Sequence, residues 1–266
     1  MKGSEAFDFV VLGSGCYEPG LPGPGKVRNP AGYAVRRGDQ VLLFDLGFGN
    51  LRQLVRAGLR PDEVSHVFVT HRHPDHIGDL PALLFYYRYD GRPRRGRLRL
   101  YGPRGFRNFL ERLTRAHHPW LRPRGFRMSV EELEEPAVVR GEGWRVACRE
   151  VPHTTESLAY RFECRGGSVC YTGDTEWDSG LARFAAGTDL LVVECSLADR
   201  ARTAGHLRVS EAIRLGRMSG ARRVLLTHFS PASEKGLSRR IARDRRFRKA
   251  EDLMRIRIGR TKSGKR

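Results

Sequence analysis

The heptapeptide at positions 70–76, THRHPDH, constrains this chain more than any other segment. It places three histidines and one aspartate directly after Val64 to Val69, an apolar run that predicts a buried strand. Neutral imidazole nitrogens and carboxylate oxygens are the ligands that zinc takes in Lewis-acidic sites, whereas structural zinc sites rely on cysteine. The alternative is a solvated, histidine-rich loop. Four potential ligands at the end of one strand favour a metal site over that loop.

The spacing within the heptapeptide predicts how these ligands divide. In an extended loop, residues two apart project to one side, while residues adjacent in sequence diverge. His71 and His73 can therefore serve one metal ion, and Asp75 with His76 can serve a neighbouring one.

Four further polar residues follow or close apolar runs, so we expect them at the ends of buried strands. They are His153 after residues 151–152, Asp174 after Gly173, Glu194 after the run 189–193, and His228 after the run 224–227. Polar groups at strand ends line the edge of a sheet, where the sites of α/β folds collect. One such residue alone is usually a structural group with its hydrogen bonds satisfied, and the repeated pattern is what favours a site.

Strand-like and helix-like patterns alternate along the 266 residues. Strands are expected near 7–12, 32–37, 40–45, 64–69, 97–101, 144–151, 157–163, 168–173, 189–194, 223–227 and 253–258. Helices are expected near 51–59, 77–87, 104–116, 177–186, 208–218 and 234–246, and residues 117–143 have no clear pattern. Hairpins mixed with strand-helix units predict sheets with helices on their outer faces, an α/β (α+β) class. We expect one domain over residues 1–258 and a basic, disordered tail over 259–266.

Charge is the second unusual property, because lysine and arginine exceed aspartate and glutamate by 49 to 30, a net +19. Residues 235–266 hold fourteen basic against three acidic residues, and residues 88–107 hold eight arginines against one aspartate. Clustered arginine is typical of proteins that bind a phosphate-rich partner such as RNA, and Arg92, Arg94 and Arg95 are candidate substrate contacts. The alternative is a compositional bias, since arginines outnumber lysines 43 to 6 along the chain.

The five cysteines, at 16, 148, 164, 170 and 195, are odd in number and form no CxxC pair, which favours a reducing compartment. Residues 1–9 include three charged side chains and predict no signal peptide. No apolar run approaches the roughly 18 residues of a membrane span. We therefore expect a cytoplasmic protein with no membrane partner.

The order of these residues resembles the metallo-β-lactamase superfamily and, within it, the ribonuclease Z-like branch. The marks of the superfamily are a His-x-His-x-Asp-His motif, then a histidine, then Gly-Asp-Thr, then a histidine at the end of a strand. The marks of the branch are FDLG at 44–47, LYGP at 100–103, SLAYR at 157–161, GDT at 173–175, Glu194, GHL at 205–207 and THFS at 227–230. The resemblance covers residues 7–258, nearly the whole chain.

The resemblance implies a four-layer αββα sandwich, with two mixed sheets face to face and helices outside. It implies one zinc ion bound by His71, His73 and His153, a second bound by Asp75, His76 and His228, and Asp174 bridging the two. Mn²⁺ or Fe²⁺ are alternatives to zinc. A metal pair of this kind lowers the pKa of bound water and thereby supplies the nucleophile for hydrolysis.

The resemblance also assigns an acid pair and two further carboxylates. Glu194 and His206 occupy the places of the pair that protonates the leaving oxygen, and carboxylate support raises the basicity of the imidazole as that role requires. Asp75 is expected to orient the nucleophile. Asp45 is expected to hold the second ring nitrogen of a ligand, and a turn residue would also fit its position.

The sequence departs from the branch in one large respect. In tRNA-processing members, a long arm that grips the tRNA elbow emerges between the third histidine and the bridging aspartate. Only twenty residues separate His153 from Asp174 here, enough for a hairpin alone. Either the basic clusters replace the arm electrostatically or the substrate is not tRNA. Cys195-Ser196 and Leu207 also differ from the residues usual in the branch, and we expect both changes to be tolerated.

Three functions are compatible with the sequence. The first is a dinuclear zinc phosphodiesterase similar to ribonuclease Z that acts on RNA, including as a 3′ tRNA-processing endoribonuclease. The second is an aryl sulfatase, lactonase or other ester hydrolase, because the same metal pair serves those reactions. The acid pair favours a poor alkoxide leaving group, and hence a phosphodiester. The third, a non-catalytic RNA-binding protein, is weakened by the complete ligand set. The branch resemblance also suggests a homodimer.

Overall fold

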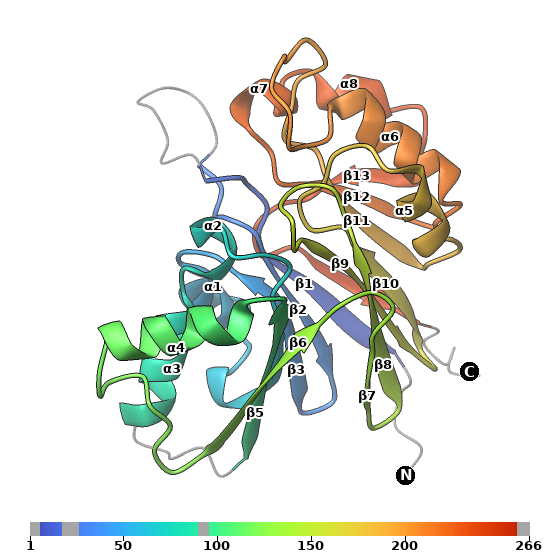
Figure 1. Ribbon diagram of the computed structural model, residues 1–266. Coiled ribbons are helices and arrows are strands. Elements are labelled where there is room, and N and C mark those ends of the chain that lie inside the picture. Colours follow the sequence, from blue (N-terminus) through green and yellow to red (C-terminus); the bar gives the residue numbers. More distant parts are fainter. Residues whose placement is uncertain (1–5, 18–26, 90–95, 260–266) are drawn as a thin grey trace, which may run out of the picture.

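The computed structural model of the protein describes residues 6–17, 27–89 and 96–259, and two seven-stranded sheets dominate it (Figure 1). In the first sheet the strand order is β14-β1-β2-β3-β4-β5-β6, and in the second it is β13-β12-β11-β10-β9-β8-β7. The first sheet contains β1 (Phe7–Gly13), β2 (Gly32–Arg37), β3 (Gln40–Leu46), β4 (Val64–Phe68), β5 (Arg97–Pro103), β6 (Arg127–Leu133) and β14 (Arg255–Ile258). The second contains β7 (Val138–Gly141), β8 (Trp144–Glu150), β9 (Leu158–Cys164), β10 (Gly167–Tyr171), β11 (Leu190–Glu194), β12 (Val224–Thr227) and β13 (Phe247–Lys249).

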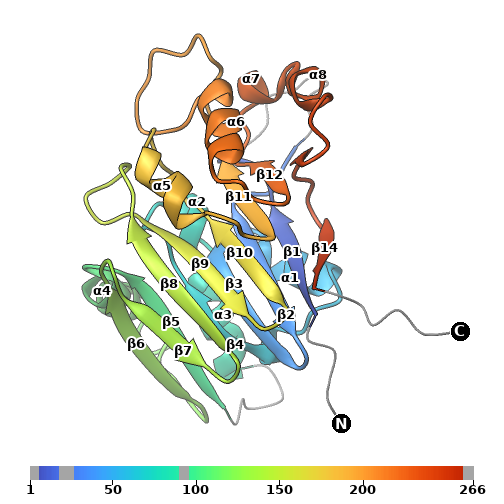
Figure 2. The same cartoon turned by 90° about the vertical axis from the view of Figure 1, so that its right-hand side faces the viewer.

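The helices lie on the outer faces of the two sheets, which face each other (Figures 1 and 2). On the first sheet they are α1 (Asn50–Arg56), η1 (Pro61–Glu63), α2 (Pro74–Ile77), α3 (Leu80–Tyr89) and α4 (Phe106–Ala116). On the side of the second sheet they are α5 (Ser179–Phe184), α6 (Val209–Met218), α7 (Pro231–Glu234) and α8 (Leu237–Ile241). The predicted αββα sandwich is confirmed.

Two apolar clusters hold these layers together. The larger one fills the space between the sheets, where Phe7 of β1 meets Phe162 of β9 with ring centroids 5.1 Å apart. The other lies between the first sheet and its helices and includes Leu43, Leu83 and Leu110. The central strands are buried on both faces, so they are nearly continuous apolar runs with no strict alternation.

Strand direction explains why distant polar residues meet. In the first sheet, β3 and β4 run parallel. In the second sheet, β10, β11 and β12 run parallel, and β8 has the same direction because it is related to β10 by two antiparallel pairings through β9. The carboxyl ends of these strands therefore gather at one end of each sheet, where the loops that follow them carry the predicted site residues.

The structure corrects several predicted boundaries. The helix expected at 77–87 is two helices, α2 and α3, because the backbone of Asp79 donates a hydrogen bond to Leu46 and interrupts the run. Asp75 and His76 therefore lie in a helical turn, and the extended-loop argument for their pairing was wrong. The unpatterned stretch 117–143 contains β6 and β7. Of the helix expected at 234–246, only α8 (Leu237–Ile241) forms, since Gly236 adopts a φ of 75° and separates α7 from α8.

Arg92, Arg94 and Arg95 and the tail from residue 260 lie outside the described residues. Within the described part of the chain, no helix combines the length and apolar character needed to cross a bilayer.

Candidate metal centre

The predicted site residues meet at the end of the sandwich where the two sheets come together. His71, His73, Asp75 and His76 follow β4, and Asp45 is near the end of β3. From the second sheet, His153 follows β8, Asp174 follows β10, Glu194 ends β11, His206 lies between β11 and α6, and His228 follows β12. The structure thus brings together every predicted ligand and both members of the predicted acid pair.

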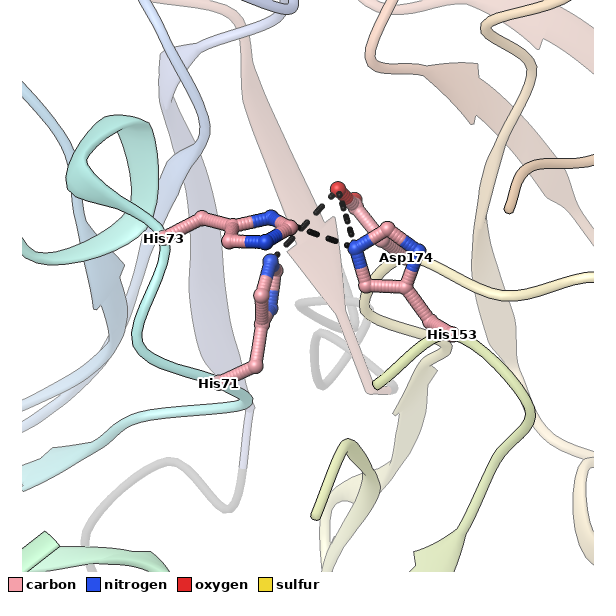
Figure 3. Close-up of side chains that lie close together, drawn as sticks. All are labelled: His71, His73, His153 and Asp174. Atoms are coloured by element: carbon pink, nitrogen blue, oxygen red, sulfur yellow. Dashed lines mark hydrogen bonds and ion pairs between the residues drawn. The ribbon is translucent and has the colours of Figure 1, made fainter. Parts of the chain in front are cut away.

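One group of potential ligands consists of His71, His73, His153 and Asp174, whose donor atoms all lie within 4.8 Å of one another (Figure 3). Nε2 of His153 lies 3.2 Å from Nδ1 of His73. Nε2 of His71 and Nε2 of His153 are each 3.8 Å from Oδ2 of Asp174. Figure 3 shows the three imidazoles and the carboxylate turned toward a common centre.

A second group consists of Asp75, His76 and His228. Nε2 of His76 lies 3.3 Å from Nε2 of His228, and Oδ2 of Asp75 lies 3.6 Å from the same His228 nitrogen. Asp174 reaches this group as well, because its Oδ2 is 3.2 Å from His76 and its Oδ1 is 3.5 Å from His228. Asp174 therefore lies between the two groups, where a bridging carboxylate would have to be.

The donor set fits a metal by its burial and by its unused hydrogen-bonding capacity. Nε2 of His71 and Oδ1 of Asp174 are among the few buried side-chain polar atoms in the described residues that have no hydrogen-bond partner. Burial lowers the pKa of His71 and keeps its imidazole neutral. Burial alone would raise the pKa of Asp174, but His228 and His76 hold it well below its usual range. Neutral imidazole and ionised carboxylate are the forms that bind a divalent cation.

Asp45 holds His76 of the second group in place through hydrogen bonds. Its Oδ2 accepts hydrogen bonds of 2.8 Å from Nδ1 of His76, from the Thr70 hydroxyl and from the Tyr171 hydroxyl, and its Oδ1 accepts one from the Thr70 amide. The bond to Nδ1 places the lone pair of His76 on Nε2, the atom that faces Asp174. Asp45 has a φ of 59° and His228 a φ of 56°, so two of the three non-glycine residues with positive φ in the described chain belong to this site.

Glu194 and His206 form a hydrogen-bonded pair beside the ligand groups. Nδ1 of His206 lies 2.8 Å from Oε1 of Glu194, which is fully buried. His206 is also 3.8 Å from Oδ2 of Asp174, and a quarter of its side chain is exposed. Burial lowers the pKa of His206, but the hydrogen bond and the charge of Glu194 outweigh it and raise the pKa to about 9. The side chain can therefore carry a proton at neutral pH at the open side of the site.

Three contacts in the site were not predicted. The Tyr171 hydroxyl holds Asp45 from the opposite sheet. Oγ of Ser196 lies 2.7 Å from Nδ1 of His228. The Gly205 carbonyl lies 2.5 Å from Nδ1 of His153, so the residue before His206 orients a ligand of the first group. Tyr171 and Gly205 contact partners far away in the sequence, which no local pattern reveals, whereas Ser196 is close to Glu194 and could have been considered.

Comparison with known proteins agrees with this geometry. A family model described as "Beta-lactamase superfamily domain" matches residues 40–229, well over half of the chain. The chain belongs to this superfamily. Among its relatives, the ribonuclease Z of Haloferax volcanii is 30% identical over 262 residues, which cover 78% of this chain and 81% of the relative. The ribonuclease Z of Methanothermobacter thermautotrophicus is 28% identical over 259 residues, with coverage of 78% and 83%.

Solved structures of the superfamily share the fold. The Bacillus subtilis metallo-β-lactamase fold protein YhfI superposes with a TM-score of 0.75 at 21% identity, covering 95% of this chain and 99% of its own. The short form of human tRNase Z superposes with a TM-score of 0.73 at 24% identity, covering 94% and 98%. These structures confirm the fold, and the family match and the ribonuclease Z relatives confirm the resemblance seen in the sequence. This member of the superfamily is a ribonuclease Z-like, metal-dependent hydrolase.

Proposed function

We propose that the protein is a dinuclear zinc phosphodiesterase that cleaves RNA, with the 3′ end of precursor tRNA as the first candidate substrate. The hydrogen bond between Glu194 and His206 beside the ligand groups is the observation that carries this proposal. The 3′ oxygen that leaves an RNA phosphodiester is a poor leaving group as an alkoxide. A protonated imidazole next to the metal ligands supplies the proton that such a group needs, and a good leaving group would not require it.

The proposal assigns a role to each residue, and Asp75 has two. His71, His73 and His153 would hold one zinc ion, Asp75, His76 and His228 would hold the other, and Asp174 would contact both. When bound, the two ions activate water and neutralise charge on the scissile phosphate. Asp75 orients the attacking oxygen. Glu194 fixes the His206 tautomer and keeps Nε2 protonated, and His206 protonates the departing oxygen.

Charge supports RNA as the substrate class, with two qualifications. The net charge of +19 favours a polyanion, and counterion release would make its binding strongly salt-dependent. Part of the C-terminal basic cluster is used within the fold, since Arg240 pairs with Asp199 and Lys249 pairs with Glu234.

The segment between His153 and Asp174 contains the β9–β10 hairpin and no projecting arm. A tRNA substrate would therefore have to be held by other surfaces.

The decisive experiment supplies the zinc-loaded protein with four substrates in parallel. They are a precursor tRNA with a 3′ trailer, bis(p-nitrophenyl) phosphate, an aryl sulfate and a lactone. We expect cleavage of both phosphodiesters and, in the precursor, cleavage directly after the discriminator base. Turnover of the sulfate or lactone alone would overturn the phosphodiesterase proposal. Metal analysis of the same sample should find two zinc ions per chain, and Mn²⁺ and Fe²⁺ reconstitution tests the metal identity.

We also propose a homodimer. An open cavity of about 480 Å³ on the outer helical layer is lined by Phe85, Tyr89 and Trp120, and all three side chains are at least 44% exposed. An exposed aromatic surface of this kind is typical of protein contacts. Sedimentation of the protein and of Trp120→Glu tests this, because the charged side chain should release monomers if the surface is buried in a dimer. An unchanged mass would remove this surface from consideration.

A cytoplasmic location remains our proposal for the cell. It is supported by the five cysteines, which are odd in number and form no CxxC pair. Fractionation of cells that express the tagged protein tests it.

A further inference from the structure

Two exposed aromatic side chains, Tyr17 and Phe48, form a pair on two segments that adjoin the predicted metal ligands. Their ring centroids are 5.6 Å apart with the planes tilted by 55°. Tyr17 is 58% exposed and Phe48 is 40% exposed. These rings have no role in the metal site or in the acid pair. Exposed aromatic rings that the fold holds in place present an apolar face to solvent.

Phe48 is fixed against the helix that carries two of the predicted ligands. The preceding Gly47 packs so closely on α2 that a Cβ there would lie 2.0 Å from the carbonyl oxygen of Asp75. The Phe48 ring itself covers Gly78, where a Cβ would lie 2.3 Å from the ring. Any larger residue at either glycine would push the chain away from α2. Phe48 is therefore held against the C-terminal end of α2, the helix that carries Asp75.

Tyr17 lies on a segment that is hydrogen-bonded next to His228, another ligand of the second group. The amide of Cys16 donates a hydrogen bond of 3.2 Å to the carbonyl of Phe229, the residue directly after His228. Nδ2 of Asn29, on the same connection as Tyr17, donates a hydrogen bond of 3.0 Å to the carbonyl of Phe48. The aromatic pair thus joins the two segments that carry Asp75 and His228.

We propose that Tyr17 and Phe48 are a stacking site for one nucleobase of the substrate, in a nucleotide adjacent to the scissile phosphate. This inference rests on the proposed phosphodiesterase function and specifies its substrate as nucleic acid with an unpaired base at the site. Stacking on aromatic side chains is how proteins bind single-stranded nucleic acid with little sequence preference. Because the sugar-phosphate backbone between neighbouring bases is flexible, a base can reach a platform at the rim of the centre that holds its phosphate.

The spacing of the rings defines how the base binds. A base inserted between two parallel rings needs about 7 Å, twice the contact distance of about 3.5 Å. The 5.6 Å separation and the tilt exclude such insertion. The base therefore stacks on the outer face of one ring while the other ring contacts its edge. One base is bound, and a double-stranded substrate in which every base is paired cannot use the site.

The test compares variants that remove the aromatic faces while keeping apolar packing. Phe48→Leu and Tyr17→Leu remove the faces, and Phe48→Tyr and Tyr17→Phe retain them. Val138→Ala, at an exposed apolar position of β7, is the control. The substrates are an RNA hairpin with a single-stranded 3′ trailer and the same RNA with abasic nucleotides on either side of the scissile phosphate. Binding of the trailer RNA to metal-stripped protein is measured in parallel by fluorescence anisotropy.

We expect the two leucine variants to raise KM for the complete RNA roughly 5- to 100-fold, the effect of losing one base-aromatic stack, with kcat changed by less than about twofold. On the abasic RNA the KM of the leucine variants should differ from that of the original protein by less than about twofold. The aromatic replacements and Val138→Ala should match the original protein on both RNAs. An equal KM increase on complete and abasic RNA, or no increase, overturns the stacking site.

Failure of the proposed function would be visible separately. If the original protein cleaved neither RNA nor bis(p-nitrophenyl) phosphate, the phosphodiesterase proposal would fail. The anisotropy experiment would still decide the stacking site, because weaker binding by the leucine variants supports it and equal binding overturns it.

Discussion

Oγ of Ser196 lies 2.7 Å from Nδ1 of His228 and connects this predicted metal ligand to the acid pair. The same hydroxyl donates a hydrogen bond of 2.8 Å to Oε2 of Glu194. Because the hydroxyl donates to the carboxylate, its lone pair is available to accept from Nδ1 of His228. That arrangement keeps Nε2 of His228 unprotonated and directed at Asp75 and Asp174. One side chain thus fixes the tautomer of a ligand and the position of the carboxylate that supports His206.

Ser196→Ala should therefore weaken metal binding at the second ligand group without unfolding the protein. Supporting hydrogen bonds of this kind are worth about 10- to 100-fold in metal affinity or activity. Ser196→Thr should retain most of the affinity, because the hydroxyl is kept. Chelator competition with metal analysis measures the change, and Ser129→Ala on the exposed surface of β6 is the control. Equal affinity in the alanine variant and the original protein would show that Ser196 has no such role.

His206→Ala should separate catalysis from metal binding. His206 also lies near Asp174 and His228, with which it forms a third possible ligand group, but it is paired with Glu194 and belongs to neither of the two groups described above. Metal content should therefore stay at the original level. Loss of the proton donor should lower kcat about 10²- to 10⁴-fold on an RNA phosphodiester. The decrease should be smaller on bis(p-nitrophenyl) phosphate, whose nitrophenolate leaves without protonation. His118→Ala, an exposed loop histidine, is the control. Loss of zinc from His206→Ala would assign the imidazole to the metal instead.

The sequence predicted the strands that carry the site because those strands are buried on both faces. A run such as residues 190–194 is apolar at consecutive positions and ends in a carboxylate, so both the strand and its terminal polar residue are visible locally. The heptapeptide 70–76 is equally local. The convergence of ligands from both sheets was inferred from the family resemblance, and only the structure shows the two ligand groups and Asp174 between them.

The elements that were missed depend on non-local contacts. β6 is an edge strand with four of its seven side chains exposed and three charged. It is held by backbone pairing with β5 from Arg97 to Pro103. β13 has three residues, too few for any period to appear. The hydrogen bond from Tyr171 to Asp45 joins residues 126 positions apart. Local propensity contains no information on such pairs, which exist only after the two sheets pack together.

Asp45→Asn should impair metal binding through the tautomer of His76. Asparagine tolerates the positive φ of position 45 and has nearly the same shape, so the backbone should be preserved. The new amide nitrogen would face Nδ1 of His76, and two donors cannot pair. His76 would then carry its proton on Nε2, the atom that now faces Asp174. We expect metal affinity to fall at least about 10-fold. Asp39→Asn in an exposed turn is the control, and unchanged zinc affinity in Asp45→Asn would contradict the argument.

Acid should weaken the contact between the segment at Arg28 and α7. Nη2 of Arg28 lies 2.6 Å from Oε1 of Glu234, and Nζ of Lys249 lies 2.9 Å from the same oxygen. The hydrogen bond from Arg28 is the largest influence and lowers the pKa of Glu234 from 4.5 to about 2. A lowered folded-state pKa means that the unfolded chain binds the proton more readily. The stabilisation is therefore fully present above pH 4.5 and is lost as the pH falls toward 2.

Thermal unfolding of metal-stripped protein between pH 7 and pH 3 measures this effect, with Glu234→Gln for comparison. At pH 7 the glutamine variant should be less stable by about 1–2 kcal/mol, less than the full pKa shift would give because 21% of the Glu234 side chain is exposed. Below pH 4.5 the difference in stability should shrink steadily, because the unfolded chain takes up a proton at Glu234 while the folded protein does not. It should vanish only as the pH approaches 2, where folded Glu234 also becomes neutral. Metal stripping excludes a contribution from acid release of zinc. A difference that stayed constant from pH 7 to pH 3 would show that the charge of Glu234 does not stabilise the fold.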